Sequence, residues 1–234
     1  HKLLKSGLKV AICEQVEDPK QAKGIVKREV VEVLTPGIAI NDKFLDNAEN
    51  NYLASIYIEG SKLSISLIDN STGEFFAGEF CESDCINFLS RYNVSEIVVS
   101  DLSKDEIIKI ISGYKINIST IPDWELDLST CVDRIKNLYG IRSLKGLGIH
   151  NNESIIISCG MILAYLDINL CSSMNHIDIL KIISDEEFLL IDSFTSKNLE
   201  IFNSISSNDE NGTLISILDY TISSIGSRML KSWI

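Results

Sequence analysis

The pattern of apolar and polar positions changes twice along the 234-residue chain and divides it into three parts. In the first part, a mainly apolar run of strand length spans 8–13, and apolar residues recur with imperfect alternation along 26–34, which predicts two strands. Between them, Asp18-Pro19 is a helix-start signal, and Thr35-Pro36-Gly37 ends the second strand. A piece of this size lacks half of an α/β unit, so we expect that it cannot complete a core alone.

The second part has the pattern of an α/β domain. Residues 38–51 are polar and rich in Asn and Asp, which predicts a linker, and three strand-like runs separated by turn signals follow it. Strands and helices then alternate, which predicts a sheet of mixed direction. The expected strands are 52–59, 63–69, 74–80, 96–99 and 115–120, and the expected helices are 82–92, 104–111, 128–140 and 153–171.

The third part is helical in character, with expected helices at 194–205, 213–220 and 223–234. In the second part, Ser83 and Ser103 are the expected N-caps of their helices, and Ser103 forms a capping box with Glu106. The predicted organisation is therefore 1–37, a linker at 38–51, an α/β domain at 52–185, and a helical region at 186–234.

Charge is distributed unevenly between these parts. The whole chain has a formal net charge of −12, which argues against nucleic-acid binding by its bulk. Residues 1–37 nevertheless hold seven Lys or Arg and five acidic residues, a net of +2, so the remainder carries −14. This asymmetry fits a nucleic-acid-facing segment joined to an acidic module, and it also fits an ordinary solvated surface.

The six cysteines do not have the spacing of a zinc site, since only Cys81 and Cys85 are close and no CxxC pair occurs. We expect buried thiols, with Cys81 and Cys85 in the core, and a reducing cytoplasmic setting. No run approaches 18 uncharged apolar residues, so no membrane span or signal peptide is expected. The chain starts without Met and is expected to be a segment of a larger protein.

Three sets of motifs resemble the MutS family of DNA mismatch-repair proteins. The string from Val10-Ala11-Ile12-Cys13-Glu14-Gln15 to Thr35-Pro36-Gly37 is similar to the end of the family's mismatch-binding domain. Leu67-Ile68-Asp69 with Ser71-Thr72-Gly73 resembles the central strand and turn of its connector domain. Asp192-Ser193-Phe194-Thr195 and Gly226-Ser227-Arg228-Met229-Leu230-Lys231-Ser232-Trp233 resemble the start of its helical core and lever region.

The resemblance implies an α/β, RNase H-like mixed-sheet connector domain. It would be flanked by the end of an α/β mismatch-binding domain and the start of an all-α core domain. The parent would be a homodimer that binds mismatched double-stranded DNA in an ATP-dependent cycle and recruits the partner protein MutL. ATP and Mg²⁺ are cofactors of the parent alone, because this sequence contains no GxxxxGK[ST] loop to hold them. We expect no enzymatic activity, cofactor or metal ion in this segment.

Two groups of residues are candidates for contacts with partners. Lys23, Lys27 and Arg28 are candidates for the DNA backbone, where they would position the duplex without reading its sequence. The alternative is a solvated strand edge. The resemblance also places recruitment of MutL near 124–139, with candidates Val132, Asp133 and Lys136. The alternative there is an ordinary exposed helix.

Two other functions remain open from the sequence. An RNase H-like metal-dependent nuclease would need Asp69 and a second carboxylate, of which Glu74 and Asp101 are the nearest. Asp and Ser or Thr at such a position are also ordinary turn formers. A MutS relative that acts on recombination intermediates would lack the Phe-x-Glu that the repair type carries upstream of this segment.

Overall fold

The computed structural model describes residues 2–17, 26–38, 50–92, 94–112, 114, 116–169, 174, 176–183, 191, 193–205 and 212–234. Its first elements are α1 (Lys2–Lys5) and the strands β1 (Val10–Gln15) and β2 (Arg28–Leu34). The central elements are β3 (Tyr52–Glu59), β4 (Lys62–Asp69), β5 (Phe75–Cys81), α2 (Glu82–Arg91), β6 (Val94–Ser100), α3 (Lys104–Ile110), β7 (Asn117–Ile121), the 3-10 helix η1 (Asp123–Leu126), α4 (Leu128–Tyr139), the 3-10 helix η2 (Leu144–Leu147), α5 (Glu153–Asn169) and β8 (Lys181–Ile182). The last elements are α6 (Ser193–Asn198), α7 (Leu214–Leu218) and α8 (Ser224–Trp233).

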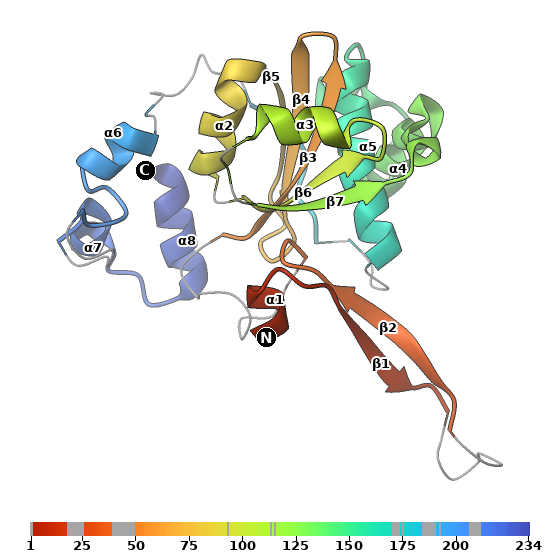
Figure 1. The fold of residues 1–234 in the computed structure, drawn as a ribbon, viewed down its shortest axis with the longest axis horizontal. Coiled ribbons are helices and arrows are strands. Elements are labelled where there is room, and N and C mark those ends of the chain that lie inside the picture. The colour runs from red at the N-terminus through yellow and green to blue at the C-terminus, as the bar shows by residue number, and fades with distance from the viewer. Residues whose placement is uncertain are drawn as a thin grey trace.

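A six-stranded mixed sheet forms the centre of the molecule, in the order β7-β6-β3-β4-β5-β8 (Figure 1). Strand β4 runs antiparallel to both of its neighbours, and the other pairs are parallel. Helices α4 and α5 cover one face, and α2 and α3 cover the other. The prediction of an α/β fold with a mixed sheet is confirmed.

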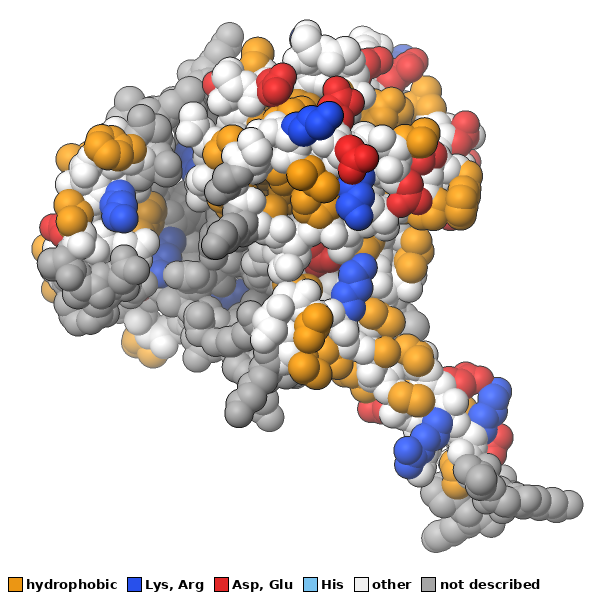
Figure 2. All heavy atoms as spheres, viewed as in Figure 1, with side chains coloured by type: hydrophobic (Ala, Val, Ile, Leu, Met, Phe, Trp, Pro, Cys, Tyr) orange, Lys and Arg blue, Asp and Glu red, His pale blue; other side chains and the backbone are white. Residues whose placement is uncertain are grey.

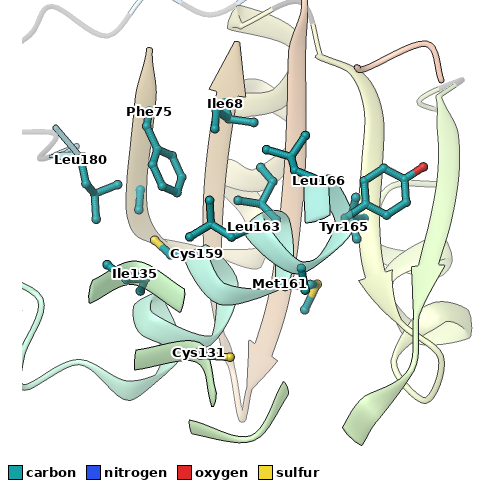
Figure 3. Close-up of a cluster of buried hydrophobic side chains, with 14 of the residues drawn as sticks. Ile68, Phe75, Cys131, Ile135, Cys159, Met161, Leu163, Tyr165, Leu166 and Leu180 are labelled. Atoms are coloured by element: carbon teal, nitrogen blue, oxygen red, sulfur yellow. The ribbon is translucent and has the colours of Figure 1, made fainter. Parts of the chain in front are cut away.

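Both faces of the sheet are buried because successive residues of a strand point to opposite sides. On β3, Leu53 packs toward α5, whereas Ala54 and Ile56 join the cluster beneath α2 and α3. Helix α5 is buried almost all round, as its apolar sequence predicts. Figure 3 shows its side chains between the strands and α4. At Gly160 the helices approach so closely that an added Cβ would lie 2.4 Å from Cys131 Sγ.

Strands β1 and β2 form a two-stranded antiparallel hairpin that projects from the rest of the molecule (Figure 1). We call it the hairpin arm. Its register runs from the pair Val10 and Leu34 at the base to the pair Gln15 and Arg28 at the outer end. Leu34 is buried at the base, whereas most of β1 is exposed. The two predicted strands are confirmed, and the expected helix after Asp18-Pro19 lies outside the described residues.

The C-terminal region is helical as expected, but two of its helices are shorter than the sequence pattern predicts. Helix α6 ends at Asn198 because Glu200 adopts a left-handed backbone conformation with φ +49°. The Ile201 N–H then bonds to the carbonyl of Ser196, and the Glu200 N–H bonds to that of Lys197. This pair of bonds is a Schellman motif, which ends a helix even without glycine.

Three local predictions in the α/β part are wrong. Helix α2 begins after Cys81 rather than at Ser83, and no side chain caps it. Ser103 occupies the N-cap position of α3 as expected, but the predicted capping box does not form. Its side chain makes no capping bond, because its backbone is already helical and its hydroxyl lies 2.9 Å from that of Ser100. Cys81 is exposed, since it follows the inward-facing Phe80 at the end of β5. In the described part of the chain, no helix is both long and apolar enough to cross a membrane.

Candidate functional site

Two of the three basic residues predicted to contact DNA belong to the outer end of the hairpin arm. Lys27 and Arg28 lie there, with Arg28 opposite Gln15, and Lys23 lies outside the described residues. Lys27 Nζ is 2.5 Å from Glu29 Oε1, and both side chains are exposed. Figure 2 shows basic and acidic side chains together near this end of the arm. The local field is therefore mixed rather than uniformly positive.

The three residues predicted to contact a partner protein all lie on α4, but they do not form one surface. Asp133 is 72% exposed and pairs with Lys136 at 3.8 Å. Val132 is partly buried and packs against the core between the sheet and α5. The structure therefore brings Asp133 and Lys136 together on the surface, whereas Val132 is mainly a packing residue.

An exposed aromatic side chain precedes this helix. Trp124 lies in η1 and is 77% exposed. Arg134 of α4 holds η1 in place, since it donates to the Glu125 carbonyl at 2.8 Å and pairs with the Glu125 carboxylate. The Asp127 side chain caps α4, and hydrogen bonds from Ser129 and Thr130 lower the pKa of its carboxyl group. Exposed Trp124 therefore lies on a 3-10 helix that Arg134 of α4 holds in place through Glu125.

A buried carboxylate joins the base of the hairpin arm to the sheet. Glu96, on β6, is 1% exposed, and its Oε2 accepts hydrogen bonds from Thr35 Oγ1 at 2.5 Å and the Gly37 N–H at 3.0 Å. Its Oε1 accepts the hydroxyls of Ser119 at 2.5 Å and Tyr165 at 2.6 Å. One side chain therefore connects the base of the arm with β7 and α5. We call these five residues the Glu96 clamp.

The surroundings of the clamp are closely packed and keep its hydrogen-bond donors in place. A Cβ added to Gly37 would lie 2.9 Å from Glu96 Cβ and 2.8 Å from Leu53 Cδ1, so only glycine fits there. Burial, reinforced by the charge of Glu96, raises the pKa of the Tyr165 hydroxyl, which therefore stays protonated and donates. Lys9, just before β1, lies over the Tyr165 ring at 5.1 Å.

Sequence reasoning did not single out Glu96. The available signal was an acidic residue at the start of an otherwise apolar strand, because a charge buried in a sheet needs hydrogen-bond partners. Its partners could not be named, since they lie 61, 23 and 69 residues away along the chain.

Asp69 is fully buried at the end of β4, where it organises a turn. Its Oδ1 accepts the Ser71 N–H at 2.8 Å and the Ser71 hydroxyl at 2.7 Å, and its Oδ2 accepts the Asn51 N–H at 3.2 Å. The Asn51 side chain in turn donates to the Pro36 carbonyl at 2.8 Å and accepts the Ser95 hydroxyl at 2.5 Å. Asp69 is thus a structural carboxylate beside the arm.

The carboxylates considered for a nuclease have other partners. Glu74 accepts the Tyr52 hydroxyl at 2.6 Å and the Asn50 amide at 3.0 Å. Asp101 follows the C-terminal end of β6, which is parallel to β3 and so runs opposite to β4. Asp69 and Asp101 therefore lie toward opposite ends of the sheet. In the described ranges, no three His, Cys, Asp or Glu side chains are grouped to hold a metal ion.

Comparison with known families divides the chain in a similar way. The family model for MutS domain I matches residues 1–43, and the model for MutS domain II matches residues 51–178. The first match contains the hairpin arm. The second contains strands β3 to β7 of the six-stranded sheet and ends before β8.

Curated relatives match along the whole chain, and each is described as DNA mismatch repair protein MutS. The chain is 39% identical to the protein of Flavobacterium psychrophilum, 38% to that of Cytophaga hutchinsonii and 37% to that of Parabacteroides distasonis. It spans only 26–27% of the length of these relatives.

Among solved structures, the large terminase nuclease from the thermophilic phage G20c is similar over 59% of this chain and 90% of its own. The sequence identity is 13% and the TM-score is 0.34. Values this low support no argument about activity.

Proposed function

Since this chain belongs to the MutS family of DNA mismatch repair proteins, we propose that it is the joint between the domain that reads DNA and the helical core. The Glu96 clamp carries the first half of this proposal, because its buried hydrogen bonds fix the base of the hairpin arm relative to the sheet and α5. The nuclease alternative is not favoured, since the curated relatives are mismatch repair proteins.

The proposal includes a finer description of the domains. Residues 1–37 would be the end of the mismatch-binding domain, 38–51 a linker, 52–185 an RNase H-like connector, and 186–234 the start of the core. A sheet in which only β4 opposes the other described strands supports an RNase H-like connector. The linker residues 39–49 and the boundary residues 184–190 lie outside the described part of the chain.

In the parent protein, Lys23, Lys27 and Arg28 would contact the DNA backbone. Phosphate contacts are strongly salt-dependent, because each neutralised phosphate releases counterions. We expect Arg28→Gln to lower the slope of log K against log salt by about 0.9 for duplex DNA. The control is Lys62→Gln, an exposed lysine of β4 outside the arm. An unchanged slope for Arg28→Gln would remove this residue from the DNA contact.

The α4 surface, with Trp124, Asp133 and Lys136, would bind MutL. Tryptophan is one of the residues that most often dominate binding, and Trp124 is exposed. Asp133 and Lys136 add a charged pair on α4. Binding of the MutL N-terminal domain can be measured by fluorescence anisotropy with Lys136→Glu and Trp124→Ala. The matched control is Lys104→Glu on α3, on the other face of the sheet. Equal affinity for all variants would place the docking surface elsewhere.

Nucleotide chemistry would belong to other parts of the parent, a cytoplasmic homodimer that uses ATP and Mg²⁺. The residues of this segment do not fit that role. The sequence contains no phosphate-cradling GxxxxGK[ST] loop, and the carboxylates of buried Asp69 and partly buried Glu74 are already hydrogen-bonded within the fold. The segment would take part in the ATP-dependent cycle by transmitting changes in domain orientation.

A further inference from the structure

A continuous series of hydrogen bonds leads from the base of the hairpin arm to helix α8. Asn51 donates from Nδ2 to the Pro36 carbonyl at 2.8 Å and from its backbone N–H to Asp69 Oδ2 at 3.2 Å. Asp69 Oδ1 accepts the Ser71 hydroxyl at 2.7 Å. Arg228 Nη1 then donates to Ser71 Oγ at 2.8 Å. The series connects three segments that are far apart in sequence.

Within this series, Asp69 alone uses one side-chain oxygen to bond toward the arm and the other to bond toward α8. Its Oδ2 faces the Asn51 backbone, and its Oδ1 faces the turn that Arg228 reaches. An ionised carboxylate can accept at both oxygens, whereas a carboxamide offers one acceptor and one donor. Asp69 is fully buried and Arg228 is 5% exposed, so water does not substitute readily for these bonds.

We propose that Asp69 is a positioning residue that holds the hairpin arm and helix α8 in place at the same time. The inference rests on the proposed function of this segment as a joint, and it names the side chain through which the two neighbours meet. The arm depends on Asp69 through Asn51, and α8 depends on it through Ser71. The Glu96 clamp differs, because its hydrogen bonds reach the arm, β7 and α5 but not α8.

The geometry allows each connection to be broken separately. Asn51→Ala removes the bond to Pro36 and keeps the backbone bond to Asp69. Ser71→Ala removes the acceptor for Arg228 and keeps the Ser71 N–H bond to Asp69. Asp69→Asn keeps the shape and replaces one acceptor by a donor. Ser64→Ala is the matched control, since Ser64 is a buried serine of the same strand whose hydroxyl has no hydrogen-bond partner among the described residues.

Pulsed electron paramagnetic resonance on doubly spin-labelled chains measures the two positions directly. Labels on the exposed thiols of Cys13 and Cys81 report the arm against the sheet. Labels on Cys81 and on the cysteine of W233C report α8 against the sheet, since Trp233 is 73% exposed. All other cysteines are replaced by serine or alanine, and circular dichroism confirms that each variant is folded.

We expect Asp69→Asn to displace both distributions, with at least about fivefold more molecules outside the wild-type distance peak. Asn51→Ala should displace only the arm, Ser71→Ala only α8, and Ser64→Ala neither. If Asp69→Asn does not fold, the double variant of Asn51→Ala and Ser71→Ala should displace both. A folded Asp69→Asn, or a folded double variant in its place, that displaces one element or neither would overturn the proposal. No DNA or MutL is present, so such a result would leave the proposed function to its own binding tests.

Discussion

At the scale of single residues, two buried carboxylates carry the contacts between parts of this chain. Glu96 accepts four hydrogen bonds from Thr35, Gly37, Ser119 and Tyr165. Asp69 accepts bonds from the Asn51 backbone and from the Ser71 turn. A buried charge is stable only when its hydrogen-bonding capacity is filled, so removing either carboxylate leaves several donors unpaired.

We predict that Glu96→Ala lowers the free energy of unfolding by about 3 kcal/mol, because buried hydroxyls lose their acceptor. Urea denaturation followed by circular dichroism measures this loss. Glu79→Gln is the control, because Glu79 is partly exposed and pairs with exposed Lys62 at 3.7 Å, and its effect should stay within about 0.5 kcal/mol. Equal losses for the two variants would show that the clamp does not stabilise the fold.

The buried thiols predict a dependence of stability on alkaline pH. Burial raises the pKa of Cys131 to about 11 and those of Cys85 and Cys159 to about 12. In the unfolded chain these thiols have a pKa of about 8.5. A raised pKa favours the protonated folded form, so this contribution to stability is complete below about pH 8.5 and is lost as the pH rises toward 11–12.

Urea denaturation at a series of pH values should therefore show a free energy of unfolding that falls as the pH rises above the unfolded thiol pKa of about 8.5. Cys159→Ala should make this decline less steep between about pH 8.5 and 10, below the range in which tyrosines ionise. Cys13→Ala is the control, because Cys13 is exposed. A decline of the same steepness in all three proteins would contradict a role for the buried thiol.

At the scale of elements, the sheet and its helices are self-supporting, whereas the hairpin arm is not. Helix α5 is enclosed by β3, β4 and α4, and its side chains fill the space shown in Figure 3. An isolated two-stranded hairpin is only marginally stable in water, and this arm exposes Val16 and Val30. The arm therefore depends on the contacts at its base and, in the proposed parent, on the rest of the mismatch-binding domain.

We predict that Gly160→Ala separates α4 from α5 and destabilises the protein by about 1–3 kcal/mol or more through overpacking. Its added Cβ would lie 2.4 Å from both Cβ and Sγ of Cys131. Gly146→Ala in η2 is the matched control, since nothing lies within 4 Å of its Cβ position. Thermal unfolding compares the two variants, and similar melting temperatures would mean that this contact is loose.

The elements were predictable where side-chain periodicity determines them. Strand β3 occupies the expected 52–59, and α4 ends at Tyr139, just before Gly140 in the left-handed conformation that favours glycine. Helix starts were less predictable, because Ser103 bonds to a neighbouring serine instead of the helix N-terminus. The site was the least predictable part, since the Glu96 clamp consists of tertiary contacts that no local pattern encodes.

At the scale of the whole molecule, a projecting arm with mixed charge is fixed to an acidic α/β body. The first 37 residues carry a formal charge of +2 and the remainder carries −14, so long-range attraction of DNA by the body is not expected. In the proposed function, orientation of the arm would be the main contribution of this segment to DNA recognition. In the account proposed here, the Glu96 clamp sets that orientation.

The affinity of the full-length protein for DNA with and without a mismatch tests this claim most directly. The ratio of the two affinities, measured at one fixed salt concentration, reports specificity rather than charge attraction. We predict that Glu96→Gln, which replaces one acceptor of the clamp by a donor, lowers this ratio by about tenfold, a change of about 1.4 kcal/mol. Glu79→Gln should leave it unchanged. A wild-type ratio in a folded Glu96→Gln protein would contradict the view that this segment positions the domain that reads DNA.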